Sequence, residues 1–132
     1  MATCYFAATG AEVTTVDLPE SAFNLPSVDD TLAACGLAAE VVRKPSREAM
    51  AEWAAVGRQF DLVYVDGSHT LGDALTDLLL ADLLLVPGGW LLVDDIDNAD
   101  FPGVRTAWEH FLRLRGYDRD DRPNWGVGRR PT

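Results

Sequence analysis

Short apolar runs alternate along this chain with segments whose apolar residues recur at helical spacing. The runs contain β-branched and aromatic residues and end near a proline, a glycine or an acid, as strands do. We expect strands at residues 13–18, 40–43, 60–66 and 90–94.

Helical patterns fill the segments between these strands. Asp29 or Asp30 is expected to cap a short first helix, and Ser46 to cap a second. Leucines form a broad stripe along 71–86, and apolar residues recur at i, i+4, i+7 and i+8 along 104–114. Two short extended pieces are expected after the last of these helices.

This alternation over residues 1–132 predicts a single α/β domain with an open, mainly parallel, Rossmann-like sheet and flanking helices. The continuous apolar run at 62–65 is typical of a strand covered on both faces. The sequence Pro87-Gly88-Gly89 is expected to turn the chain into the strand at 90–94.

Composition and charge exclude some functions. Hydrophobic residues make up 48% of the chain, enough for a core, and the net charge is -10. This sign disfavours phosphate backbones and anionic membrane surfaces, so neither nucleic acid nor membrane is an expected partner. Residues 1–10 lack a basic leader, and acids interrupt the apolar region 71–93, so we expect a cytoplasmic protein.

Acids stand at the ends of three of the four predicted strands. They are Asp17, Asp66 and the pair Asp94-Asp95. Any one of them could simply cap a helix or end a strand. In an open parallel sheet, however, ligands bind at the carboxyl ends of the strands. Asp66, Asp94 and Asp95 could therefore converge as three oxygen ligands for Mg²⁺ or Mn²⁺.

Two further residues have a chemical interpretation. Asp17 could accept hydrogen bonds from both hydroxyls of a ribose. His69 follows Asp66 by three residues, where it could be a general base or cap the next helix. His110 is expected to be structural or exposed.

Four motifs, taken in order, resemble the class I S-adenosylmethionine-dependent methyltransferases. They are VTTVDL, DLVYVDGSHT, VPGG and LLVDDIDN. The most similar branch is the small-molecule O-methyltransferases with a D-G-x-H segment, a P-G-G turn and an acid pair. The resemblance extends over nearly the whole chain.

The resemblance implies a cofactor site for S-adenosylmethionine. Asp17 corresponds to the acid that holds the cofactor ribose, and Ser46 lies in the loop that approaches the adenine. Asp66 is also implied to lie at the cofactor.

The resemblance also implies a metal and a base. Asp66, Asp94 and Asp95 correspond to the acidic ligands of Mg²⁺ (or Mn²⁺) in the metal-dependent members, and His69 to the catalytic base. The acceptor oxygen would attack the sulfonium methyl in line, with the metal lowering the hydroxyl pKa and His69 taking the proton.

One element of the family has no counterpart here. The family begins with a strand and a glycine-rich loop, whereas residues 1–10 resemble the end of the helix that follows them. That strand normally lies between those carrying Asp17 and Asp66. We therefore expect an N-terminally truncated domain that lacks its first strand and half of its cofactor pocket. A shortened reading frame is the favoured explanation; a degenerate protein, or first residues that substitute as a strand, are the alternatives.

The leading hypothesis is metal-dependent O-methyl transfer to a small-molecule hydroxyl acceptor. A non-catalytic remnant is the alternative, binding a partner or forming a homo-oligomer through an uncovered strand edge. A third hypothesis is a related metal-dependent enzyme of the cephalosporin-hydroxylase-like branch.

Overall fold

The computed structural model describes residues 2–18 and 27–132. Contacts divide the chain into two compact units, Met1–Ala49 and Met50–Thr132, and each is described by itself. Within the described residues, no helix combines the length and the hydrophobicity needed to cross a membrane.

The first unit contains a two-stranded parallel sheet. Its elements are α1 (Ala2–Ala8), β1 (Thr14–Asp17), α2 (Val28–Ala34), β2 (Glu40–Arg43) and the start of α3 (Ser46–Ala55). The register pairs Thr14 with Glu40 and Asp17 with Arg43. The cap of α2 is Ser27, whose side chain accepts a hydrogen bond from the Asp30 backbone N–H at 3.1 Å, so the expectation that Asp29 or Asp30 caps it was wrong.

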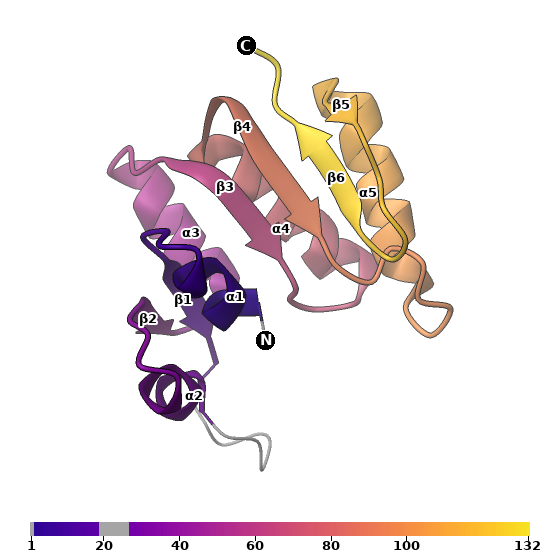
Figure 1. Ribbon diagram of the computed structural model, residues 1–132. Helices are drawn as coiled ribbons and strands as arrows, with labels where there is room; N and C mark the ends of the chain where they lie inside the picture. The colour runs from indigo at the N-terminus through magenta and orange to yellow at the C-terminus, as the bar shows by residue number, and fades with distance from the viewer. Residues whose placement is uncertain (1, 19–26) are drawn as a thin grey trace. The chain divides into compact units, whose positions relative to one another are not determined.

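The second unit contains a four-stranded sheet in the order β3-β4-β6-β5 (Figure 1). Its elements after α3 are β3 (Phe60–Val65), α4 (Leu71–Leu84), β4 (Leu85–Val93), α5 (Pro102–Arg115), β5 (Asp118–Arg119) and β6 (Gly126–Arg129). Strands β3 and β4 are parallel, and β6 is antiparallel to both of its neighbours. The expected α/β class is confirmed, with parallel pairing in both sheets.

No strand is shared between the two sheets in the described part of the chain. Strand β1 pairs with β2, and β3 pairs with β4.

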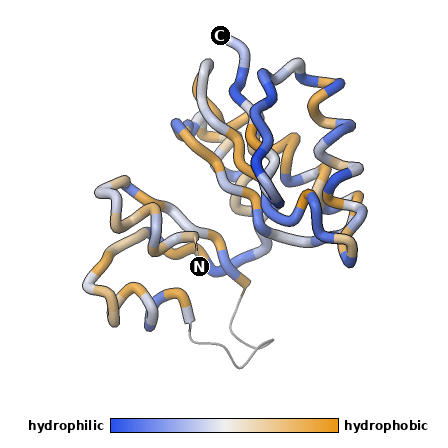
Figure 2. Tube along the Cα trace, turned by 45° about the vertical axis from the view of Figure 1, so that its right-hand side comes forward, coloured by the Kyte–Doolittle hydropathy of each residue, from blue (hydrophilic) through white to orange (hydrophobic). Residues whose placement is uncertain are grey.

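Helices α4 and α5 bury the core of the second unit against one face of its sheet. Trp108 and Phe111 of α5 and Leu78 of α4 are fully buried. A side chain at Gly126 or Gly128 of β6 would lie 2.8 Å from the Trp108 ring, so these glycines let the indole lie against the strand. Figure 2 shows the hydrophobic residues along β3, β4 and α4, and hydrophilic residues in the segment that follows α5.

Of the two acids buried in the described part of this unit, Asp77 and Asp82, the second has basic partners. Asp82 of α4 is 2% exposed and pairs with Arg115. The Tyr117 hydroxyl donates to Asp82 Oδ1 at 2.7 Å, and Arg130 Nε lies 3.6 Å from the same atom. These bonds tie α4 to the end of α5 and to the C-terminal segment.

Two predicted details of the second unit were wrong. Leu62 is 37% exposed, so β3 is not covered on both faces as its apolar run predicted. Pro87-Gly88-Gly89 lies within β4, at an irregularity where the register jumps from Phe60–Leu85 to Leu62–Trp90, and not in a turn before the strand. The sequence did not reveal that β4 begins directly after α4.

Candidate active site

Parallel pairing brings the acids of β3 and β4 to one edge of the sheet. Val65 and Val93 are partners in the register, so Asp66 and Asp94 follow at the same level. The Asp94 backbone N–H donates to the carbonyl of Val65 at 3.0 Å, which extends the pairing by one residue. Asp66 and Asp94 therefore follow two neighbouring parallel strands at the same edge of this sheet.

Three predicted residues converge at this edge. One potential ligand atom each from Asp66, His69 and Asp95 lies within 4.8 Å of the others. His69 Nε2 lies 3.1 Å from Asp95 Oδ2. The Asp94 carboxylate does not join this group of described residues, although its residue lines a small hollow together with Asp66 and His69.

The position of His69 is fixed by the start of α5. The imidazole stacks on Phe101, with 3.8 Å between ring centroids and 10° between planes. A Cβ at Gly103 would lie 2.8 Å from the backbone nitrogen of Leu71 and 3.0 Å from the His69 carbonyl oxygen. The first turn of α5 therefore approaches the histidine loop closely because residue 103 lacks a side chain.

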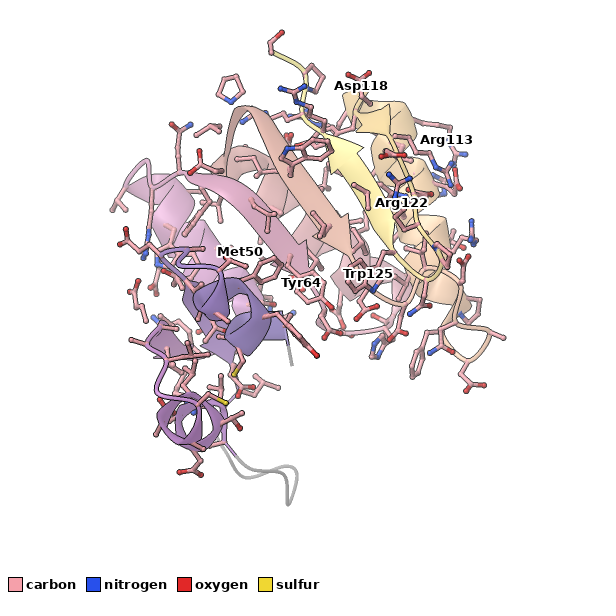
Figure 3. The ribbon with its side chains drawn as sticks, viewed as in Figure 1. Met50, Tyr64, Arg113, Asp118, Arg122 and Trp125 are labelled. Carbon is pink, nitrogen blue, oxygen red and sulfur yellow. The ribbon has the colours of Figure 1, made fainter. Side chains whose placement is uncertain are left out.

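Amide and phenol donors surround the acid pair. The Tyr64 hydroxyl donates to Asp94 Oδ2 at 2.6 Å. Asn98 Nδ2 donates to Asp95 Oδ1 at 3.1 Å, and Asn124 Nδ2 lies 3.2 Å from Asp94 Oδ1 and 3.3 Å from Asp95 Oδ1. Figure 3 shows Tyr64 near the carboxyl end of β3 and Trp125, the neighbour of Asn124, at the start of β6.

The two converging acids have opposite pKa shifts. Although Asp66 is an exposed residue, partial burial of its carboxyl group, followed by the charges of Asp94 and Asp95, raises its pKa. Hydrogen bonds from Asn98 and Asn124, together with His69, lower the pKa of Asp95 against the effect of burial. A cation beside Asp66 would lower its pKa again, because a positive charge favours the ionised carboxylate. Carboxylate oxygens are also the ligands that Mg²⁺ and Mn²⁺ prefer. The donor set therefore fits such an ion.

Tyr64 stays a hydrogen-bond donor in this site. Burial, the hydrogen bond to Asp94 and the charges of nearby acids all raise the pKa of its phenol. The neutral hydroxyl therefore persists at physiological pH and keeps donating to Asp94.

The other two predicted residues, Asp17 and Ser46, belong to the first unit. Asp17 ends β1, is half-exposed, and accepts hydrogen bonds from Arg43 Nη1 at 2.7 Å and from the Leu18 backbone N–H at 2.9 Å. Ser46 is the first residue of α3. Their assignment to a cofactor stays a prediction.

Sequence reasoning missed four residues that contact the site. They are Tyr64, Asn98, Phe101 and Asn124. Tyr64 and Asn98 lie within or beside the recognised motifs, and strand alternation could have placed Tyr64 on the same face as Asp66. Phe101 and Asn124 had no local signal, because their roles depend on contacts between distant segments.

Comparison with known proteins identifies a family. A family model described as a methyltransferase domain matches residues 1–96. This range includes Asp17 and all the acids and the histidine discussed above. No curated protein matches the chain.

Solved structures share the fold at low sequence identity. CalS11, a TDP-rhamnose 3′-O-methyltransferase of calicheamicin biosynthesis, has a TM-score of 0.67 and 20% identity over 89% of this chain and 58% of its own. A Staphylococcus aureus protein with the provisional name of caffeoyl-CoA O-methyltransferase has a TM-score of 0.72 and 13% identity over 95% and 68%. MycE of mycinamycin biosynthesis, in complex with Mg, SAH and mycinamycin VI, has a TM-score of 0.64 and 12% identity over 92% and 36%. The chain thus spans little more than half of CalS11 and about a third of MycE.

Proposed function

Because this chain belongs to the methyltransferase domain family, we propose that it takes part in S-adenosylmethionine-dependent O-methyl transfer to a small-molecule hydroxyl with the help of Mg²⁺ or Mn²⁺. The observation that carries the proposal is the convergence of Asp66, His69 and Asp95 within 4.8 Å at the carboxyl ends of β3 and β4. The proposal is also supported by two methyltransferases of similar fold, CalS11 of calicheamicin biosynthesis and MycE of the mycinamycin biosynthetic pathway.

The acids would hold the metal. Asp66 and Asp95 offer carboxylate oxygens in the cluster, and Asp94 follows β4 beside them. A bound divalent cation supplies a Lewis acid that lowers the pKa of an acceptor hydroxyl. Burial, and after it the charges of Asp94 and Asp95, raise the pKa of Asp66, and a cation bound beside these acids would favour its ionised form.

His69 would move the proton. Its ring is 35% exposed and held by Phe101, so an acceptor hydroxyl can reach it while its orientation is kept. Bound S-adenosylmethionine would supply the methyl group: a carbon–oxygen bond would form as the methyl–sulfur bond breaks, S-adenosylhomocysteine would be the leaving group, and His69 would take the hydroxyl proton. Proton uptake gives an imidazolium with Nε2 3.1 Å from Asp95 Oδ2, and the carboxylate charge stabilises it.

Asp17, Ser46 and Asp66 would bind S-adenosylmethionine. The half-exposed carboxylate of Asp17 can accept hydrogen bonds from two ribose hydroxyls if it exchanges its partner Arg43 for them. Ser46 would lie at the adenine, and Asp66 at the boundary between cofactor and metal.

Calorimetric titration with S-adenosylmethionine, with and without Mg²⁺, tests this proposal. We expect micromolar binding by the wild type and at least about tenfold weaker binding by Asp17→Ala, because a charge-assisted hydrogen bond is lost. Asp30→Ala is the matched control, since it removes an exposed acid of the same unit. A folded wild type that does not bind would contradict the proposal and favour a non-catalytic binding module.

Methyl transfer itself is tested with labelled cofactor and a panel of small hydroxyl compounds. We expect transfer that requires Mg²⁺ or Mn²⁺ and is lost in His69→Ala. Transfer that persists in the presence of a chelator would rule out the metal.

A further inference from the structure

Asn124 contacts the segment that follows β4, residues 94–97 (the acid loop), through its side chain and through both of its backbone polar groups. It lies between β5 and β6, far in sequence from Asp94 and Asp95. Its side-chain amide reaches both acids, at 3.2 Å and 3.3 Å from their Oδ1 atoms. Its backbone N–H donates to Asp97 Oδ2 at 2.9 Å, and its carbonyl accepts from the Ile96 N–H at 3.1 Å.

The backbone conformation at this contact is uncommon. Asn124 has φ 66° and Asp95 has φ 62°, both in the left-handed region that residues other than glycine seldom adopt. Asparagine tolerates this region better than most side chains. Such conformations persist where surrounding contacts determine them, and they are concentrated at functional sites.

The β5–β6 connection is held to the acid loop without the side-chain hydrogen bonds of Asn124. The two backbone bonds to Ile96 and Asp97 already join the β5–β6 connection to the acid loop. The amide adds a different contact: one NH₂ group lies between two neighbouring carboxylates and faces the Oδ1 atom of each. The Oδ2 atom of Asp95 is left facing His69.

We propose that Asn124 is a positioning residue for the metal site, whose amide holds the Asp94 and Asp95 carboxylates by their Oδ1 atoms and so keeps Asp95 Oδ2 beside His69, in the cluster that would bind the cation. The inference rests on the proposed metal-dependent function. Residues that orient metal ligands from outside the coordination shell commonly contribute about 10- to 100-fold to metal affinity.

Mn²⁺ binding by the full chain, followed by electron paramagnetic resonance, tests the role of the amide. Asn124→Gly removes the amide but tolerates a φ of 66° and keeps both backbone bonds. We expect it to bind Mn²⁺ about tenfold more weakly, with a changed spectrum of the bound ion. Pro123→Ala is the matched control, since it loosens the same exposed loop without removing an amide, and it should bind as the wild type does.

Two outcomes would overturn the inference. Asn124→Gly could bind Mn²⁺ with wild-type affinity, or Pro123→Ala could weaken binding equally, in which case order in the loop would matter and not the amide. Circular dichroism of each variant checks that it is folded.

A second measurement does not depend on the metal. All proteins are treated with a chelator. Relative to the wild type, we expect the NMR signals of the Asn124 side-chain amide to be shifted in Asp94→Asn and in Asp95→Asn. If the wild type bound no Mn²⁺ but these shifts were seen, the contact of the Asn124 amide with both carboxylates would be supported and the metal-dependent function would be contradicted. Amide signals that do not respond to either substitution would contradict the contact between the Asn124 amide and the two carboxylates.

Discussion

Substitution of Asp66→Asn should stabilise the metal-free protein. The ligand atoms of Asp66 and Asp95 lie within 4.8 Å. Two like charges at that distance repel by about 1 to 3 kcal/mol for effective dielectric constants between those of water and a protein surface. Asn98 and Asn124 already offset part of the Asp95 charge, so the lower value, about 1 kcal/mol, is expected.

The pH dependence of this effect follows from the raised pKa of Asp66. The folded state penalises the charged carboxylate, so the destabilisation is fully present above the folded-state pKa. It disappears as the pH falls below the unfolded-state pKa, where both states are protonated. The advantage of Asp66→Asn should therefore be largest near neutral pH and fade toward about pH 4.

Urea unfolding in the presence of a chelator measures the effect. A gain of about 1 kcal/mol moves the midpoint by about 0.5 M for a typical denaturant dependence. Saturating Mg²⁺ should reverse the order, because only the wild type gains free energy from binding. Asp118→Asn is the control, since it neutralises an exposed acid of the same unit (Figure 3). A less stable Asp66→Asn at neutral pH, or an advantage that does not depend on pH, would refute the reasoning.

Three further predictions concern the second unit. Asp82→Asn should lower the free energy of unfolding by about 2 kcal/mol, measured by urea titration, because the buried carboxylate charge that pairs with Arg115 and Arg130 is removed. Gly126→Ala should cost about 1 to 3 kcal/mol, with a change in tryptophan fluorescence, because its Cβ would lie 2.8 Å from the Trp108 ring. Phe101→Leu should move the His69 ring resonances downfield in NMR spectra, because the stacked aromatic ring is removed.

Gly126→Ala has a matched control, and each of the three predictions has a result that would contradict it. Gly72→Ala adds a methyl group in open space within α4 and should stabilise the helix by up to about 1 kcal/mol. If Gly126→Ala were equally benign, the close packing of α5 on β6 would be wrong. Unchanged stability in Asp82→Asn would mean that its partners are satisfied by water, and unchanged His69 signals in Phe101→Leu would exclude the stacking in solution.

The sequence predicted the parts of the site that depend on local pattern. Strands ending in acids and a parallel sheet are enough to bring Asp66 and Asp95 together, and the loop of three residues brings His69 with them. The cap of α2 was missed because Ser27 competes with two nearby acids. The irregularity within β4 was missed because the sequence Pro87-Gly88-Gly89 is compatible both with a turn before a strand and with an interruption inside one.

Other features depend on contacts that a local pattern does not contain. The apolar run of β3 indicates what could be buried, but burial of Leu62 requires a covering neighbour. Asn124 looks like an ordinary turn residue, and its role arises from folding against a segment far earlier in the chain. Such residues are found by geometry and not by motif.

The division into two sheets has a consequence for how the protein opens. In the described chain, the first unit contributes Val28, Leu32 and Ala49 to the buried apolar residues, whereas the second contributes the large side chains of its core. Strands buried by so few side chains exchange their amide hydrogens through small local openings. Amides of β1 and β2 should therefore take up deuterium well before those of β3 and β4. Asp17, the proposed ribose ligand, would then belong to a part of the chain that opens more easily than the part that carries the proposed metal ligands.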